Sequence, residues 1–248
     1  MVIQPRRIRR PRAFANGPIV IDYPAPALFI DGTWIASASA GSRPVINPAD
    51  GTPLAALPLA GEAELEAAVA AAQRGFAVWR ARSAHARFEC ITRATRLLRE
   101  RADAIARIMT LEQGKPLAES RREVLLSAEI IDFLAEEGKR LQGRTVPPRQ
   151  AGVLSQTVIR QPVGPVAAFT PWNFPVNLPS RKLGGALAAG CSVIIKPAEE
   201  TPASCMLLVE AFHDAGLPPG VINMVCGEPA AISTALIASA PIRKVSFT

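Results

Sequence analysis

Asn173 is the residue whose type and setting most directly suggest chemistry. It lies in the sequence FTPWNFP at residues 169–175, directly after the apolar run at 166–169. A neutral amide in a rigid, apolar loop suits donating a hydrogen bond to a developing oxyanion, because dry surroundings strengthen that bond. The alternative is that Asn173 only caps its own loop, and the residues alone leave both interpretations open.

Lys196 and Glu199 form a second candidate pair, placed after the next apolar run at residues 193–195. A cation and a carboxylate in this position can bind the hydroxyl groups of a ribose, with the carboxylate accepting from the 2′-OH. The competing interpretation is an ion pair at the protein surface. No G-x-G-x-x-G follows an expected strand, and Gly184-Gly185 falls inside an expected helix, so the usual dinucleotide fingerprint is absent.

Both candidates follow segments that predict buried parallel strands. Residues 166–169 and 193–195 are short, wholly apolar and without alternation. In an open α/β sheet, ligands bind just beyond the carboxyl ends of such strands. We therefore expect the loop of Trp172 and Asn173 and the loop from Lys196 to Glu199 to line one crevice.

The elements that position these loops belong to an α/β fold with a Rossmann-like parallel sheet flanked by helices. Apolar residues recur every three or four positions between residues 62 and 138 and predict four helices. Ser83 is expected to be an N-cap and Gly114 a C-cap. Further strands are predicted at 221–225 and 243–248, each reached through a helix.

Three antiparallel features are expected outside that sheet. Hairpins at 28–35, around an Asp-Gly turn, and at 44–57 predict a small outer antiparallel sheet. A long strand is predicted at 153–160, with nothing local to cover its edges. Because a long unpaired edge is normally covered by another chain, residues 141–162 are interpreted as an arm that pairs with a partner subunit. A surface hairpin is the alternative.

Composition restricts the class of protein. The chain has 248 residues, 49% hydrophobic and 20% charged, which suits an ordinary globular protein with a substantial core. Its net charge of +7 is mostly local, because without the five arginines of residues 1–12 there remain 23 basic and 21 acidic residues. Nucleic-acid binding is therefore not expected. The Arg-rich start has no apolar segment typical of a secretory signal, and a disordered arm or an early start codon is favoured over organelle targeting.

Metal binding and membrane insertion are not expected either. No run approaches the ~18 apolar residues of a membrane span, and His85 and His213 stand far apart without acidic neighbours. The cysteines show no paired spacing, which favours reduced thiols in a cytoplasm. They are expected to act as small core side chains: Cys90, Cys191, Cys205 and Cys226.

Several motifs, taken together, resemble the NAD(P)-dependent aldehyde dehydrogenase superfamily over about residues 28–248. They look most similar to the succinate-semialdehyde and 2-oxoglutarate-semialdehyde dehydrogenases. The resemblance implies an oxidoreductase that converts a semialdehyde to its carboxylic acid with NAD(P)+. The motifs are Trp79, EQGKPL at 112–117, PWNFP at 171–175, RKL at 181–183, AAGC at 188–191, KPAE at 196–199, TP at 201–202, AG at 215–216, PGV at 219–221, Asn223 and VSFT at 245–248.

The resemblance also implies roles for individual residues. Asn173 would be the side-chain donor of the oxyanion hole, and Lys196 and Glu199 would bind the adenosine ribose. An acid at Glu199 would repel a 2′-phosphate, so NAD is expected in preference to NADP. Arg181 would pair with the substrate's distal carboxylate, which its planar fork suits; the alternative is an exposed helix arginine. The other implied cofactor-binding positions are Thr170, Pro171, Trp172, Pro197, Ala198, Gly227, Pro229, Phe247 and Thr248.

The resemblance divides the chain into an irregular Arg-rich lead-in at 1–27, a cofactor-binding domain at 28–140 and 163–248, and an oligomerisation arm at 141–162. In this family a Gly-Ser-Thr segment, a catalytic glutamate, the nucleophilic cysteine and a catalytic domain follow the VSFT motif. None is present, so the chain is expected to be an N-terminal part that is inactive alone, from a cytoplasmic homo-oligomer acting on a small aldehyde. The alternative is a non-catalytic nucleotide-binding or assembly protein derived from an aldehyde dehydrogenase.

Overall fold

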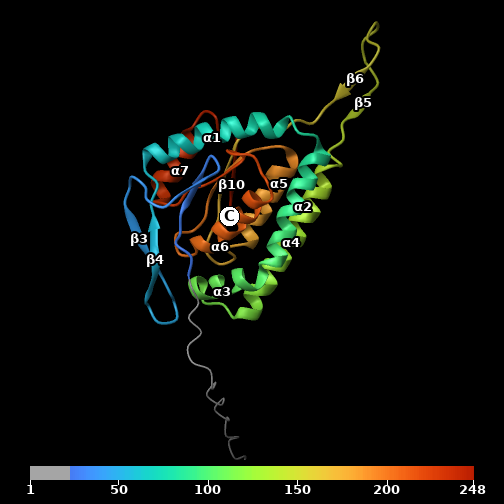
Figure 1. Ribbon diagram of the computed structural model, residues 1–248. Coiled ribbons are helices and arrows are strands. Elements are labelled where there is room, and N and C mark those ends of the chain that lie inside the picture. Colours follow the sequence, from blue (N-terminus) through green and yellow to red (C-terminus); the bar gives the residue numbers. More distant parts are fainter. Residues whose placement is uncertain (1–22) are drawn as a thin grey trace, which may run out of the picture.

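A six-stranded sheet separates two layers of helices in the computed structural model, which describes residues 23–248 (Figure 1). The strand order is β10-β7-β8-β9-β1-β2. The expected α/β class is confirmed, whereas most of the Arg-rich lead-in lies outside the described residues. The strands are β1 (Leu28–Ile30), β2 (Thr33–Ile35), β7 (Val166–Phe169), β8 (Val193–Lys196), β9 (Ile222–Met224) and β10 (Lys244–Phe247).

The centre of the sheet is parallel. β7 pairs with both β10 and β8, and β8 pairs with β9, all in parallel register. All residues of β7, β8 and β9 are buried, because helices cover both faces of the sheet. This explains why residues 166–169 and 193–195 are continuous apolar runs without alternation, and it confirms the strands predicted there.

Helices pack on both faces, and alternate strand residues point to opposite faces. Ile194 packs with Leu65 and Leu236 on one side, whereas Ile195 packs with Leu183 and Phe212 on the other. The first layer holds α1 (Glu62–Arg80) and α7 (Pro229–Ala238). The second holds α2 (Ala84–Glu100), α3 (Ala102–Gln113), α4 (Leu117–Gly138), α5 (Asn177–Ala189) and α6 (Pro202–Asp214).

The helix caps predicted at Ser83 and Gly114 are confirmed. The Ser83 hydroxyl accepts from the Ala86 N–H at 3.1 Å and so begins α2. Gly114 ends α3 in the left-handed conformation, with φ of 85°. The four helices predicted between residues 62 and 138 are also confirmed, as α1 to α4.

The two N-terminal hairpins do not share one sheet. The turn between β1 and β2 has positive φ at Asp31 (51°) and Gly32 (80°), as an Asp-Gly hairpin turn requires. However, β1 is wholly buried and pairs antiparallel with β9, with Phe29 opposite Met224. The prediction of one outer sheet was wrong for this hairpin, because β1 covers an edge of the main sheet. The outer sheet consists only of β3 (Ser42–Ile46) and β4 (Pro53–Pro58).

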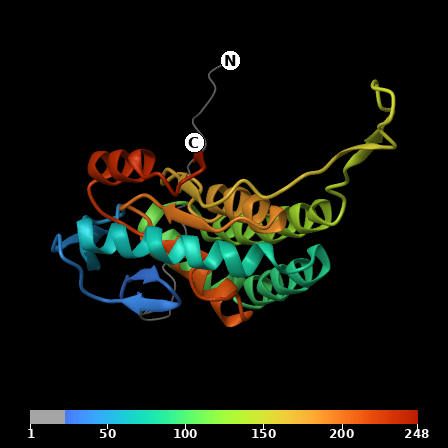
Figure 2. The ribbon, with the colours of Figure 1, turned by 90° about the horizontal axis from the view of Figure 1, so that it is seen from above.

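A narrow hairpin of β5 (Arg144–Val146) and β6 (Gln156–Val158) stands clear of the body in both views (Figures 1 and 2). The long strand predicted at 153–160 was wrong, since pairing is confined to these three-residue strands. Pro147 and Pro148 directly follow β5, and proline has no N–H for a longer ladder. Association of this arm with a partner subunit stays a prediction.

The other edge of the main sheet is apolar. Within the described residues β10 pairs only with β7. Phe247 on this strand is 80% exposed, and Val245 on the same strand is also exposed. This edge therefore offers both free backbone groups and apolar side chains for further packing.

The cysteine side chains belong to the core of the fold. All four cysteines are free and buried, which confirms their expected packing role. Burial raises the pKa of the Cys205 and Cys226 thiols.

No helix within residues 23–248 is long and apolar enough to cross a membrane. In the same range, no three His, Cys, Asp or Glu side chains are grouped to hold a metal ion.

Candidate active site at the carboxyl ends of β7 and β8

The two candidate loops begin side by side. Phe169 lies opposite Lys196 in the parallel register, and the Thr170 N–H donates to the Lys196 carbonyl at 3.2 Å. Phe247 lies opposite Phe169 on the other side, with their ring centroids 6.5 Å apart. The carboxyl ends of three adjacent strands, β10, β7 and β8, therefore lie side by side, and predicted site residues lie at or just after each of them. A ligand crevice shared by these loops stays a prediction.

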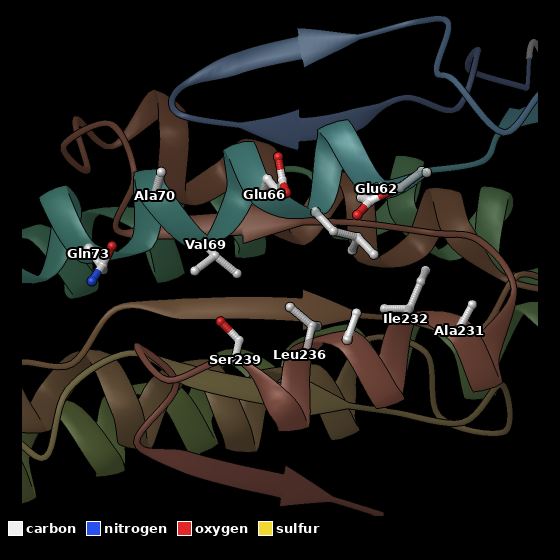
Figure 3. A pocket seen from close by; sticks show the side chains of 13 residues that line it. Glu62, Glu66, Val69, Ala70, Gln73, Ala231, Ile232, Leu236 and Ser239 are labelled. Atoms are coloured by element: carbon white, nitrogen blue, oxygen red, sulfur yellow. The ribbon is translucent and has the colours of Figure 1, made fainter.

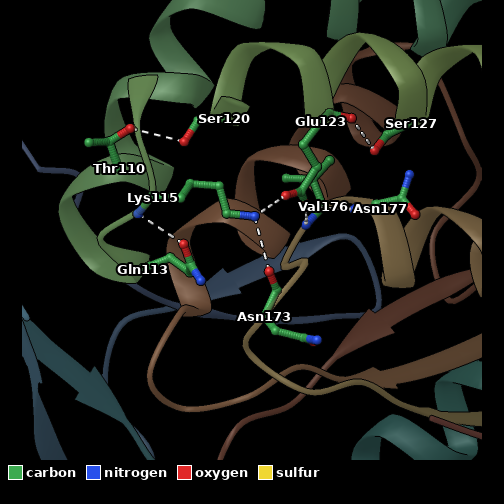
Figure 4. A network of polar contacts seen from close by, with 9 residues as sticks. All are labelled: Thr110, Gln113, Lys115, Ser120, Glu123, Ser127, Asn173, Val176 and Asn177. Carbon is green, nitrogen blue, oxygen red and sulfur yellow. Dashed lines mark hydrogen bonds and ion pairs between the residues drawn. The ribbon is translucent and has the colours of Figure 1, made fainter. Parts of the chain in front are cut away.

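The Asn173 side chain is free. It is exposed between the half-exposed rings of Trp172 and Phe174, and its amide has no hydrogen-bond partner within residues 23–248. Figure 4 shows the amide directed away from the polar network that holds its backbone. Because the amide bonds nothing in its loop, the alternative that Asn173 acts as a loop cap loses its basis.

Lys115, in the connection between α3 and α4, holds the backbone of this loop. Its Nζ donates to the Asn173 carbonyl at 3.0 Å and lies 4.4 Å from the centroid of the Phe174 ring. The same ammonium is ion-paired with the Glu123 carboxylate of α4. The loop is thus tied to the helical layer through the Asn173 carbonyl and the Phe174 ring. Figure 4 shows that the backbone contact leaves the Asn173 amide unoccupied.

Glu123 fixes the other end of the same loop. Its Oε1 accepts from the N–H groups of Val176 at 3.0 Å and Asn177 at 3.1 Å, at the start of α5. Helix α5 has no side-chain cap of its own, and a carboxylate at a helix N-terminus is favoured by the exposed N–H groups and the helix dipole. The buried Lys115–Glu123 pair therefore holds the loop at both ends.

Lys196 and Glu199 form a buried pair. Lys196 Nζ donates to Glu199 Oε2 at 2.6 Å and to the Pro197 carbonyl at 3.1 Å. The two side chains are only 8% and 3% exposed, so the interpretation as a surface ion pair was wrong. Glu199 Oε1 also accepts from the Gly227 N–H at 3.0 Å, which joins the β8 and β9 loops. Each carboxylate oxygen keeps a further lone pair for a hydroxyl donor.

The other predicted cofactor-binding positions range from buried to exposed. Thr170 is buried and its Oγ1 has no hydrogen-bond partner. A Cβ at Gly227 would lie 2.9 Å from Ile232 Cδ1 and 3.0 Å from the Ala60 carbonyl, and the φ of 156° is rare for other residues, so a side chain there would be strained. Of the other positions, Pro197 and Ala198 are buried, Pro171 is half-buried, and Trp172, Pro229, Phe247 and Thr248 are exposed.

Arg181 lies in α5, the helix that follows the Asn173 loop. It stands one turn into α5, and its Nε donates to Asn177 Oδ1 at 3.0 Å. It is exposed, as the alternative expected, but it also lines a cavity of about 620 Å³ together with Phe174. The structure therefore groups Arg181 with Phe174, the neighbour of Asn173, and neither Lys196 nor Glu199 lines this cavity.

A second cavity contains none of the predicted site residues. It measures about 540 Å³ and lies between α1 and α7 (Figure 3). Its walls are mainly apolar, with Leu65, Val69 and Leu236, and it carries the carboxylates of Glu62 and Glu66. It is separate from the residues that the sequence singled out.

Three supporting residues had no assigned role in the sequence: Lys115, Glu123 and Glu112. Glu112 accepts from the N–H groups of Ala203 at 3.1 Å and Ser204 at 2.7 Å, at the start of α6. Burial raises its pKa to about 7. The motif at 112–117 signalled that this segment matters, but its partners lie too far along the chain to be read from it.

Comparison with known proteins agrees with this geometry. Residues 34–248 match the aldehyde dehydrogenase family. The chain is 47% identical to the 4-(hydroxymethyl)benzenesulfonate dehydrogenase TsaD1 of Comamonas testosteroni, over 91% of this chain and 47% of that protein. It is 44% identical to the succinate-semialdehyde dehydrogenase [NADP(+)] GabD of Escherichia coli (strain K12), over 88% and 45%. An NAD+ complex of an aldehyde dehydrogenase from Bacillus cereus shares the fold with a TM-score of 0.86 and 31% identity, over 92% and 46%.

The chain therefore belongs to the aldehyde dehydrogenase family, a family of NAD(P)-dependent oxidoreductases. It spans about half the length of the curated relatives that it matches.

Proposed function

We propose that this chain provides the cofactor-binding part and one oxyanion donor of an NAD(P)-dependent enzyme that oxidises an anionic semialdehyde to its carboxylic acid. The observation that carries the proposal is the free Asn173 amide, held on a fixed loop beside the buried Lys196–Glu199 pair. Family membership gives that arrangement its chemical context.

Asn173 acts in this proposal as an oxyanion donor. Attack of a thiolate on an aldehyde carbon places negative charge on the carbonyl oxygen, and an amide N–H aimed at that oxygen stabilises it. The thiolate comes from outside residues 23–248, because the four described cysteines are buried and a reactive thiolate needs an accessible, electropositive setting.

Lys196 and Glu199 hold the adenosine ribose. When bound, NAD+ supplies the hydride acceptor for the oxidation. The residues present fit a nucleotide, since Glu199 retains acceptor capacity for ribose hydroxyls and the buried Thr170 Oγ1 has no partner. A carboxylate at this position also repels a 2′-phosphate, so NAD is the preferred cofactor and NADP the weaker one.

An anionic substrate is favoured by Arg181, which lines a cavity together with Phe174 of the Asn173 loop. A guanidinium can bind a carboxylate through two parallel hydrogen bonds. The names of two relatives are consistent with an anionic substrate, since one is a dehydrogenase of succinate semialdehyde and the other of 4-(hydroxymethyl)benzenesulfonate. The enzyme works in the cytoplasm as a homo-oligomer, with the β5–β6 arm as the pairing element.

A fusion tests this function. Residues 1–248 are joined to the C-terminal half of GabD from Escherichia coli, and NAD+ reduction is measured with succinate semialdehyde. We expect aldehyde-dependent reduction by the fusion and none by residues 1–248 alone. Arg181→Ala should raise KM for succinate semialdehyde more than for butanal. A folded fusion without activity would contradict the proposal and favour a non-catalytic assembly protein.

A further inference from the structure

The cavity beside the Asn173 loop contains a residue that neither the motifs nor the resemblance singled out. It lies between α4 and α5 and measures about 620 Å³. Phe174, Leu126 and Leu178 give it apolar walls, and Arg122 of α4 enters it together with Arg181 of α5. An apolar space with two guanidinium groups suits a ligand with a carbon body and an anionic end.

The charges of the cavity are unequally satisfied. Lys115 and Glu123 also line it, but they neutralise each other in a buried ion pair. Arg181 is bound only through Nε, by Asn177 Oδ1, so both of its Nη groups remain available. Arg122 is exposed and forms no ion pair with another residue of the described range 23–248. Two fork-shaped donors are therefore left without an anion.

Arg121, the preceding residue on α4, provides the contrast. Its Nε donates to Asp103 Oδ1 at 2.6 Å, and it is not among the residues that line the cavity. Adjacent arginines on one helix thus differ in what they contact: one is neutralised by an acid of α3, and the other is directed to the cavity.

We propose that Arg122 determines substrate specificity by forming, with Arg181, a two-guanidinium clamp for the terminal oxyanion of the aldehyde. This inference rests on the proposed function, because it places the aldehyde group at Asn173 and the carbon body against Phe174 and Leu178. Guanidinium groups bind carboxylate and sulfonate oxygens through charge-assisted hydrogen bonds. Glu119 also lines the cavity, and its carboxylate repels the same anion.

Ligand binding tests the clamp without turnover. Residues 1–248, or the fusion if the chain alone aggregates, are titrated with succinate and with benzenesulfonate by calorimetry, and with butanamide as the neutral probe. Arg122→Gln should weaken binding of the anions on the order of 10- to 100-fold. Glu119→Gln should strengthen anion binding. The two anions show whether a carboxylate or a sulfonate is preferred.

Arg121→Gln is the matched control, since it removes the same charge one residue away. We expect its anion affinity to stay within about twofold of the wild type, because exposed charges are screened. Equal losses in Arg121→Gln and Arg122→Gln, no loss in Arg122→Gln, or no anion binding by the wild type would each overturn the clamp. An inactive fusion with Arg122-dependent anion binding would refute only the proposed function. An active fusion in which Arg122→Gln leaves the KM for succinate semialdehyde unchanged would refute only the clamp.

Discussion

Two buried glutamates hold the starts of two helices in the same layer, but only one of them has a cationic partner. Glu123 accepts from two N–H groups at the start of α5 and is paired with Lys115. Glu112 accepts from two N–H groups at the start of α6, and its other donor is the neutral Tyr23 hydroxyl at 2.6 Å. Neither helix has a side-chain cap of its own.

The difference distinguishes a carboxylate that only caps a helix, Glu112, from one that also helps to fix a loop of the candidate site, Glu123. Without a cation, Glu112 is subject mainly to desolvation, which raises its pKa to about 7 despite its hydrogen bonds. Lys115 offsets that cost for Glu123 and also donates to the Asn173 carbonyl. The ion pair is therefore placed where a loop with a free amide must be fixed, and the neutral arrangement is placed where only a helix must begin.

Removal of Glu123 should have the largest effect. Glu123→Ala leaves the Lys115 ammonium buried without its counter-charge and uncaps α5, so we expect the free energy of unfolding to fall by about 3–5 kcal/mol. Urea unfolding followed by circular dichroism measures it. Glu129→Ala, an exposed position on the same helix, should change the value by no more than about 0.5 kcal/mol. Similar losses in both variants would contradict the role of the pair.

The pH dependence of stability should report Glu112. Its pKa is raised from 4.5 to about 7 in the folded protein, so folding favours the protonated form. The stability contribution is fully present below about pH 4.5 and is lost as pH rises through about 7, by roughly 1–3 kcal/mol. Glu112→Gln should remove this dependence. A wild-type stability that rises between pH 5 and 8, by an amount that Glu112→Gln abolishes, would contradict the assigned direction.

Lys115 should affect turnover more than binding. In the fusion with the GabD half, Lys115→Met frees the Asn173 backbone while the Glu123 bonds to α5 persist, so we expect kcat to fall about tenfold, roughly 1.4 kcal/mol, with little change in KM. Lys115→Arg keeps a cation at the site and should recover part of the loss. A rise in KM with unchanged kcat would show that Lys115 acts on binding instead.

An exposed ion pair should have the smallest effect. Arg121 and Asp103 are 53% and 74% exposed, so solvent and salt screen their attraction. A double-mutant cycle with Arg121→Ala and Asp103→Ala should give a coupling energy of about 0–0.5 kcal/mol by urea unfolding. A value near that of the Glu123 variant would remove the distinction between buried and exposed pairs.

Local signals explain which features could be predicted from the sequence. Ser83 and Gly114 each act within one turn of their own helix, and the buried strands follow from continuous apolar runs. The pairing of β1 with β9 was missed because it joins residues such as Phe29 and Met224, far apart in the sequence.

The candidate site divides in the same way. Lys196 and Glu199 are three residues apart and could be paired from one motif. The hydrogen bonds of Glu112 and Glu123 could not be predicted in this way. Glu112 accepts from residues 91 and 92 positions away, and Glu123 accepts from residues 53 and 54 positions away. Long-range hydrogen bonds of this kind follow from tertiary packing, which sequence periodicity does not specify.

The most direct measurement is a crystal structure of the fusion with NAD+ bound. We expect the hydroxyls of the adenosine ribose within hydrogen-bond distance of Lys196 Nζ or the Glu199 carboxylate, and the Asn173 amide facing the same cleft near the nicotinamide. NAD+ bound in the groove between α1 and α7, or an Asn173 amide directed into a region unconnected with Lys196, would contradict the proposal that these loops form one nucleotide site.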